Sequence, residues 1–160
     1  MKFIDRTQDR WQLQPDAEIA GPSPDRLLTL AQWEAVRDSW PADVPVGVLL
    51  PNTADVEDIA RDLPRLALVA LDFPKWVDGR AYSQAHVLRA RLRYAGEIRA
   101  TGDVVVDMML QLRRTGFDAV VLREGQRQSS AERALGFFPG FYQGDVLQPQ
   151  PRFARAEAQS

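Results

Sequence analysis

The fold is decided by the stretch Leu66-Ala67-Leu68-Val69-Ala70-Leu71 and by the loop that follows it, Asp72-Phe73-Pro74-Lys75-Trp76-Val77-Asp78-Gly79-Arg80. An unbroken apolar run that ends at Asp, Pro and Gly indicates a buried strand running out into a polar loop. Ligands of open α/β sheets bind outside the carboxyl ends of the strands. We therefore expect a functional site at this loop.

Working outward from this stretch, apolar runs alternate with segments of helical period. The predicted strands cover 44–50, 66–71, 97–101 and 119–122, and residues 141–147 are a candidate for a fifth strand. The predicted helices cover 27–40, 54–63, 83–94, 104–114 and 129–137. Thr53, Asp103 and Ser129 are the expected N-caps of the second, fourth and fifth helices. Phe3–Ile4 and Trp11–Leu13 are candidates for the short strands of a hairpin.

Repeated strand–helix units predict an α/β fold with a mostly parallel sheet of four to five strands. The units are too few for a complete eightfold barrel, so the sheet is either open with three layers or curved like a partial barrel. We expect residues 1–40 to form an N-terminal extension with a helix, 41–147 the repeat domain, and 148–160 a flexible tail.

The composition excludes several classes of function. The chain has 160 residues, no cysteine and one histidine, so thiolate chemistry, cysteine-ligated zinc and a transition-metal site are not expected. No nucleotide-binding fingerprint is present, and the cofactor stays unknown. The net charge of −2 and the lack of aromatic residues among the arginines argue against nucleic acid. With a charged start and only short apolar runs, we expect a cytoplasmic protein without a membrane segment.

The predicted strand 97–101 does not suit a sheet that is covered on both faces. Alternation places Glu97, Arg99 and Thr101 on one face, where a covered central strand would be apolar. This polar face is an exposed edge, an internal salt-bridge layer or the wall of a ligand site.

The polar residues near the strand ends make up the candidate site. Asp72 and Asp78 are the candidate general bases. Arginine and lysine beside them suit a small oxyanion such as sulfite, sulfate or phosphate. The candidate ligand-binding residues are Lys75, Arg80, Tyr82, Ser83, Arg99, Thr101, Asp103 and Arg123. An exposed Trp76 is a candidate contact for a protein partner, as are Arg113 and Arg114 at the end of a helix.

Three motifs resemble a known bacterial family. They are 73–85 with Leu88-Arg89, Gly96-Glu97-Ile98-Arg99-Ala100-Thr101-Gly102-Asp103-Val104, and Leu112-Arg113-Arg114-Thr115-Gly116-Phe117-Asp118-Ala119. The chain is identified by these motifs as a member of domain of unknown function family 934. The resemblance covers about residues 40–145 and implies a place in sulfite reduction, since members of the family are often labelled as oxidoreductases of that process.

Two functional hypotheses follow. In the first, the chain is an accessory protein of assimilatory sulfite or sulfate reduction, with an oxyanion-binding rim and a docking surface for sulfite reductase. In the second, it is a small partial-barrel enzyme with Asp72 or Asp78 as base and Lys75 or Arg99 stabilising an oxyanion. The sequence also leaves a homo-oligomer open.

Overall fold

A computed structural model describes residues 1–14, 21–138 and 140–154. Seven strands lie in one sheet within these residues, and every neighbouring pair is parallel. In sheet order they are β1 (Lys2–Phe3), β7 (Ala119–Val120), β6 (Glu97–Gly102), β5 (Leu66–Phe73), β4 (Val46–Leu50), β3 (Arg26–Thr29) and β2 (Gln12–Leu13). The α/β class and the parallel sheet are confirmed, but the predicted number of four to five strands is too low.

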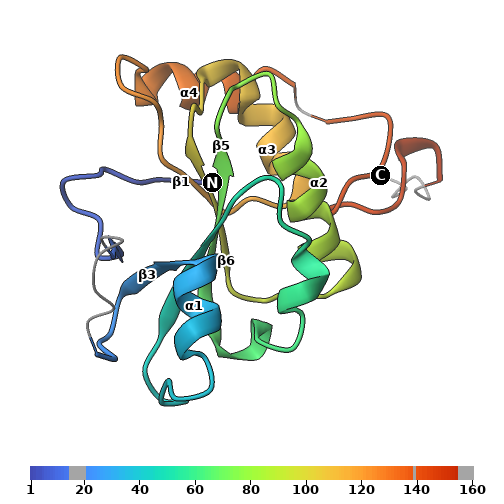
Figure 1. Cartoon of the computed structure of the whole chain (residues 1–160). Helices are drawn as coiled ribbons and strands as arrows, with labels where there is room; N and C mark the ends of the chain where they lie inside the picture. Colours follow the sequence, from blue (N-terminus) through green and yellow to red (C-terminus); the bar gives the residue numbers. More distant parts are fainter. Residues whose placement is uncertain (15–20, 139, 155–160) are drawn as a thin grey trace.

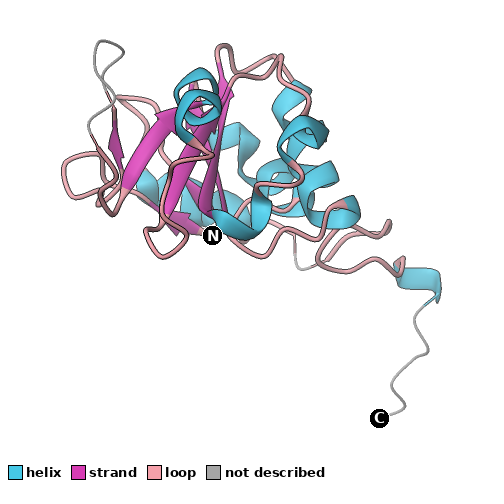
Figure 2. Ribbon diagram, turned by 60° about the horizontal axis from the view of Figure 1, so that its bottom comes forward, coloured by secondary structure: helices cyan, strands magenta, loops and turns pink. Residues whose placement is uncertain are grey.

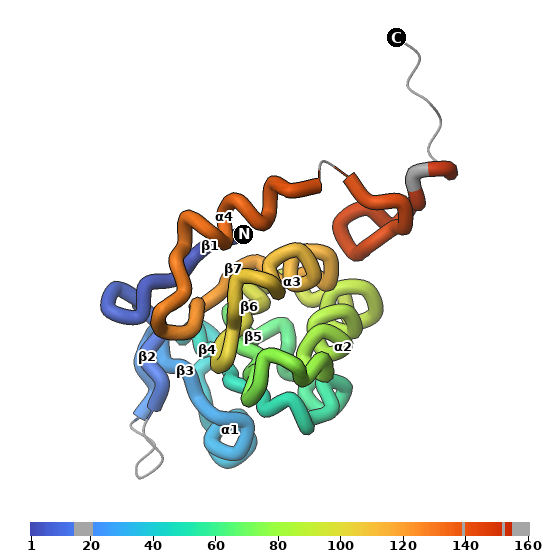
Figure 3. Tube along the Cα trace, turned by 90° about the horizontal axis from the view of Figure 1, so that it is seen from above, coloured from blue at the N-terminus to red at the C-terminus, as the bar shows by residue number. Residues whose placement is uncertain are grey.

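The sheet curls into a half-barrel. Of the two predicted shapes, the curved partial barrel is therefore the one found, and the open three-layer sheet is not. From β2 to β7 each strand lies beside the next one in the chain, and β1 lies beside β7. This is the strand order of a βα-barrel opened between its first two strands. Seen from above, the strands form an arc with the helices around its outside (Figure 3).

The α-helices of the described residues are α1 (Leu30–Val36), α2 (Arg80–His86), α3 (Met109–Thr115) and α4 (Gln128–Leu135). A π-helical turn, Val87–Arg91, continues α2, and 3₁₀ turns span Val56–Ile59, Leu63–Arg65, Val106–Met108 and Arg152–Ala154. Figure 1 shows α2 and α3 side by side against the sheet. In Figure 2 the strands lie side by side, with several helices to their right.

Two predicted helices are wrong in extent or type. Thr29 accepts a hydrogen bond from the Gln32 amide, so α1 begins after Thr29 and the preceding leucines belong to β3. The predicted helix 54–63 is instead a pair of 3₁₀ turns. Its buried residues Val56 and Ile59 are three apart, which is the period of a 3₁₀ turn, and Asp55 rather than Thr53 accepts the capping bond.

Three further predictions need correction at helix ends and near the C-terminus. Helix α3 begins at Met109 after a 3₁₀ turn, and it ends as expected before Gly116, whose φ is +102°. Helix α4 has Arg127 rather than Ser129 at its N-cap position. No strand forms among the described residues of 141–147. Of the expected flexible tail, residues 155–160 lie outside the described residues.

The two faces of the sheet are packed differently. Side chains alternate along β5, so Val69, Leu71 and Phe73 join the large core under the helices. Leu68 and Ala70 point to the concave face, where they pack with Trp11 and other apolar residues of a smaller cluster. The concave face is therefore covered by the N-terminal segment rather than by a helix.

Residues 4–11, here called the strap, cross the open side of the half-barrel. They must do so because β1 and β2 are consecutive in the chain and lie at opposite edges of the sheet. The expected hairpin is wrong, since these two strands each pair with another neighbour. We expected residues 1–40 to form an N-terminal extension with a helix. In the structure they supply three strands of the same sheet, β1, β2 and β3.

Candidate active site at the carboxyl edge of the sheet

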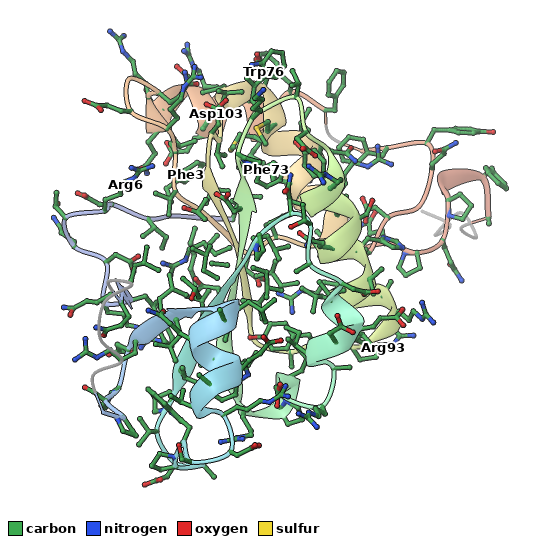
Figure 4. All side chains as sticks on the ribbon, in the orientation of Figure 1. Phe3, Arg6, Phe73, Trp76, Arg93 and Asp103 are labelled. Carbon is green, nitrogen blue, oxygen red and sulfur yellow. The ribbon has the colours of Figure 1, made fainter. Side chains whose placement is uncertain are left out.

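The loops that follow β4, β5, β6 and β7 meet at one edge of the parallel sheet, where the sequence places the site. Trp76 and Asp103 lie together at the top of the molecule in Figure 4, above Phe73 at the end of β5. The Trp76 amide donates a hydrogen bond of 3.0 Å to Asp103 Oδ2. The loops after β5 and β6 are therefore in direct contact.

Asp72 has an unusual environment for a carboxylate. It follows Leu68 and Ala70 on the concave face and is partly buried at the carboxyl end of β5. Within the described part of the chain its carboxylate has neither a hydrogen bond nor an ion pair. Burial raises the pKa of Asp72 above its ordinary value, because the charged form loses hydration and gains no partner. Such a carboxyl is suited to exchange protons with a ligand.

Gly102 makes room for Asp72. Its φ is +90°, and a Cβ atom at this position would lie 2.5 Å from Asp72 Oδ1 and 2.5 Å from the carbonyl oxygen of Phe73. Only glycine adopts this backbone conformation readily and permits so close an approach. Thr101, one of the predicted ligand-binding residues, is the partner of Asp72 in the β5–β6 register.

A cavity of about 410 Å³ opens beside Asp72, a volume within the range of small-molecule sites. Its apolar wall consists of Leu30, Ala31, Leu49 and Pro51. Its polar residues are Asp72, Thr29 and Glu34. Asp72 was expected from the sequence, whereas the other members, which come from α1 and from the ends of β3 and β4, were missed. Only the Thr29–Gln32 capping box could have shown where α1 begins.

Asp78 and Arg80 neutralise each other. Arg80 donates from Nε to Asp78 Oδ1 at 3.0 Å and from Nη2 to Oδ2 at 2.7 Å. These bonds lower the pKa of Asp78 to about 2, and the nearby Asn52 amide contributes in the same direction. A carboxylate with so low a pKa is a weak base. Of the two predicted bases, Asp72 therefore has the more suitable environment.

Asp103 connects three loops instead of capping a helix. Its Oδ2 accepts from Trp76, and its Oδ1 accepts from Arg123 Nη1 at 2.8 Å. These bonds lower the pKa of Asp103, the Trp76 amide contributing most. The β5–α2 loop is thereby fixed with Trp76 51% exposed and Val77 66% exposed. Lys75 in the same loop is exposed and makes no ion pair among the described residues.

Arg99 belongs to an internal salt-bridge layer on the concave face. Its side chain is only 4% exposed, and its Nη1 lies 2.6 Å from Asp9 Oδ2 of the strap. Its Nη2 lies 2.7 Å from Glu97 Oε1, and Glu97 also pairs with Lys2 at 3.5 Å. Of the three alternatives left open for the polar strand face, the structure shows the salt-bridge layer, and Glu97 and Arg99 also line a cavity of about 530 Å³ beside the strap. No pattern in the sequence indicated Asp9, which is distant along the chain.

The remaining predicted residues lie in four other settings. Tyr82 packs edge-to-face on Phe73 with ring centres 5.1 Å apart, and burial raises its pKa to about 12. Ser83 is exposed on α2. Arg113 donates to the carbonyl of Leu135 at 3.4 Å. Arg114 lies 3.7 Å from Asp145 and 4.5 Å from the centre of the Phe141 ring. Arg113 and Arg114 lie near the end of α3 and not among the loops of the site.

Residues 47–153 match the family of bacterial proteins of unknown function known as DUF934. The chain belongs to this family. The matched region contains β5 to β7 and all of β4 but its first residue, with Asp72, Gly102 and Asp103, whereas the strap and α1 lie before it. The DUF934 match therefore confirms the resemblance drawn from the sequence motifs. No curated protein is similar enough to the chain to count as a match.

Two further features of the described residues bear on the classes of function. No three His, Asp or Glu side chains gather closely enough to hold a metal ion there. No helix among those residues has the length and apolar character needed to cross a membrane.

Proposed function

We propose that this DUF934 protein is a small half-barrel enzyme that transfers a proton to or from a small molecule bound in the Asp72 cavity. One observation carries the proposal: a partly buried carboxyl with a raised pKa and no partner among the described residues lines an open cavity at the carboxyl edge of a parallel sheet. Unpaired burial costs stability and is expected mainly where function requires it.

The position of the cavity supports this function. In βα-barrels the catalytic groups lie at the carboxyl ends of strands, on the loops of that edge. Asp72 occupies the end of the central strand β5. A carboxyl whose pKa is raised toward neutral pH is a better general base than an ordinary one and a better general acid at pH 7. The similarity to barrels is an analogy of fold, and the chemistry rests on Asp72 itself.

The oxyanion stabilisation expected from Lys75 or Arg99 has little support. Neither side chain lines the Asp72 cavity. Arg99 already has two carboxylate partners, so its charge is compensated. The proposed reaction therefore relies on Asp72 for proton transfer and on the apolar wall for excluding water from one side of the ligand.

Deuterium exchange tests the proposal while the substrate is still unidentified. The protein is incubated in D₂O with a panel of small carbonyl compounds and aminoketones, and loss of their acidic C–H signals is followed by proton NMR. We expect exchange of at least one compound, lost in Asp72→Asn and retained in Asp38→Asn, an exposed acid outside the cavity. Loss in Asp78→Asn with retention in Asp72→Asn would assign the base to Asp78 and contradict the proposal.

A second candidate function is docking on sulfite reductase as an accessory protein of sulfite reduction. The observation that favours it is the exposed Trp76, held in a loop that the Asp103 hydrogen bond fixes before any partner arrives. A fixed, exposed tryptophan is a typical centre of a protein interface. Lys75 in the same loop is exposed and makes no ion pair among the described residues, so its ammonium group is available to a small oxyanion.

Calorimetry with purified sulfite reductase tests this second function. Docking through the loop predicts that Trp76→Ala weakens binding about tenfold or more, as for a hot-spot residue. The control is Leu13→Ala, because Leu13 is exposed to a similar extent, 53%, at the other side of the molecule on β2. Equal binding by the two variants would exclude the loop as the docking site.

A further inference from the structure

The charged residues that line the Asp72 cavity are all acidic. Two of its residues, Asp72 and Glu34, carry carboxylates, and none of its lining residues is Lys or Arg. Two arginines of the predicted site are already paired with other carboxylates, Arg80 with Asp78 and Arg123 with Asp103. An anionic ligand would meet like charges and no donor cation. The cavity is therefore unsuited to sulfite, sulfate or phosphate.

The rest of the lining argues for an organic ligand rather than a metal ion. Leu30, Ala31, Leu49 and Pro51 offer carbon surface, whereas Mg²⁺ and Ca²⁺ require several oxygen ligands. Groups of three metal-binding side chains are absent from the described residues, this cavity included. A volume of about 410 Å³ also exceeds that of an ion and suits a molecule with an alkyl body.

We propose that the ligand of the Asp72 cavity is a small primary ammonium with a short alkyl chain. This inference rests on the proposed function, since it names the substrate class of the same site. The ammonium group places its charge and its N–H donors at the Asp72 carboxylate, which has no other partner in the described structure. In this pair Asp72 accepts one N–H proton of the ammonium group, and the ligand becomes the neutral amine. The alkyl chain packs on Leu49 and Pro51. Glu34, exposed on α1, adds attraction at the mouth.

Three probes of equal length separate charge from carbon surface. They are n-butylammonium, butan-1-ol and butyrate, each titrated into isotopically labelled protein while amide and methyl NMR signals of the cavity are followed. We expect n-butylammonium to shift the signals of Leu49 and Thr29 and to bind about tenfold more tightly than either other probe, as one partly buried ion pair provides. Asp72→Asn removes this preference, and Glu34→Gln reduces it about two- to threefold.

The matched control is Asp38→Asn, which removes one exposed acid close to Glu34 in the chain without touching the cavity lining. It should bind the ammonium as the unaltered protein does. Butan-1-ol or butyrate binding as tightly as the ammonium, or no shift of the cavity signals with any probe, overturns the substrate class. The probes have no acidic C–H group, so this result is independent of the deuterium-exchange test, which decides on proton transfer.

Discussion

Replacing Arg99 by methionine should destabilise the protein strongly, because it leaves Asp9 without a cation and Glu97 with only the exposed Lys2. The side chain of Arg99 is 4% exposed, that of Asp9 17% and that of Glu97 19%. Arg99 lies 2.6 Å from the Asp9 carboxylate and 2.7 Å from that of Glu97. Removing one partner from such a buried ion pair costs about 3–5 kcal/mol. For a chain of this size each kcal/mol lowers Tm by about 2–4 °C, so we expect a decrease of about 6–20 °C.

A neutral triple variant separates lost charge balance from lost packing. Asp9→Asn, Glu97→Gln and Arg99→Met together leave no charge in this layer except that of Lys2, which is 71% exposed. Replacing a complete buried ion pair by neutral groups is often nearly neutral in free energy. Urea unfolding followed by circular dichroism measures all the variants. The reasoning is refuted if the single Arg99→Met change costs less than about 1 kcal/mol, the value typical of an exposed pair. It also fails if the triple variant is no more stable than the single one.

Three further predictions concern the site and its support. Asp72→Asn should raise the free energy of unfolding at pH 7 by about 0.5–2 kcal/mol, because it removes a partly buried charge that has no partner among the described residues. Since folding raises the pKa of Asp72, stability should fall as pH rises above 3.8 in the unaltered protein, and urea unfolding across pH should show less of this fall in the variant. Gly102→Ala should lower the free energy of unfolding by about 2–4 kcal/mol, because the new Cβ would clash with the Phe73 carbonyl and because φ at this position is positive. An unchanged Tm in thermal unfolding would contradict this. Arg89→Met should cost about 2–4 kcal/mol, because Arg89 binds Asp118 and the carbonyls of Tyr94 and Gly116, and Arg89→Lys should restore part of that loss in the same assay.

The repeated units were predictable because β4 and β5 are compact apolar runs followed by turn residues, and β6 alternates polar and apolar residues before Gly102. The run 66–71 became β5, and the segments 44–50 and 97–101 became β4 and β6 with small shifts at their ends. The edge strands were harder to predict. β1 and β2 have two residues each, too few for any period to appear, and they form because the curled sheet offers them a neighbour.

The candidate site was predictable in position and only partly in chemistry. Strand ends of a parallel sheet meet at one edge, so the sequence places Asp72, Asp78 and Asp103 on the same edge of the sheet. The sequence could not show which carboxylate is paired. Asp78 binds Arg80 two residues away, and Asp103 binds groups from two distant loops, whereas Asp72 stays without a partner in the described part of the chain. Pairing depends on side-chain direction, which spacing along the chain does not specify.

The most direct test of the central claim is the pKa of Asp72, measured from the pH dependence of its carboxyl carbon NMR signal. The account predicts titration above the ordinary value of 3.8, while Asp78 titrates near 2 in the same spectra as an internal reference. Titration of Asp72 at or below 3.8 would mean that the carboxylate is solvated or paired in solution. The proposed acid–base role at this cavity would then lose its basis.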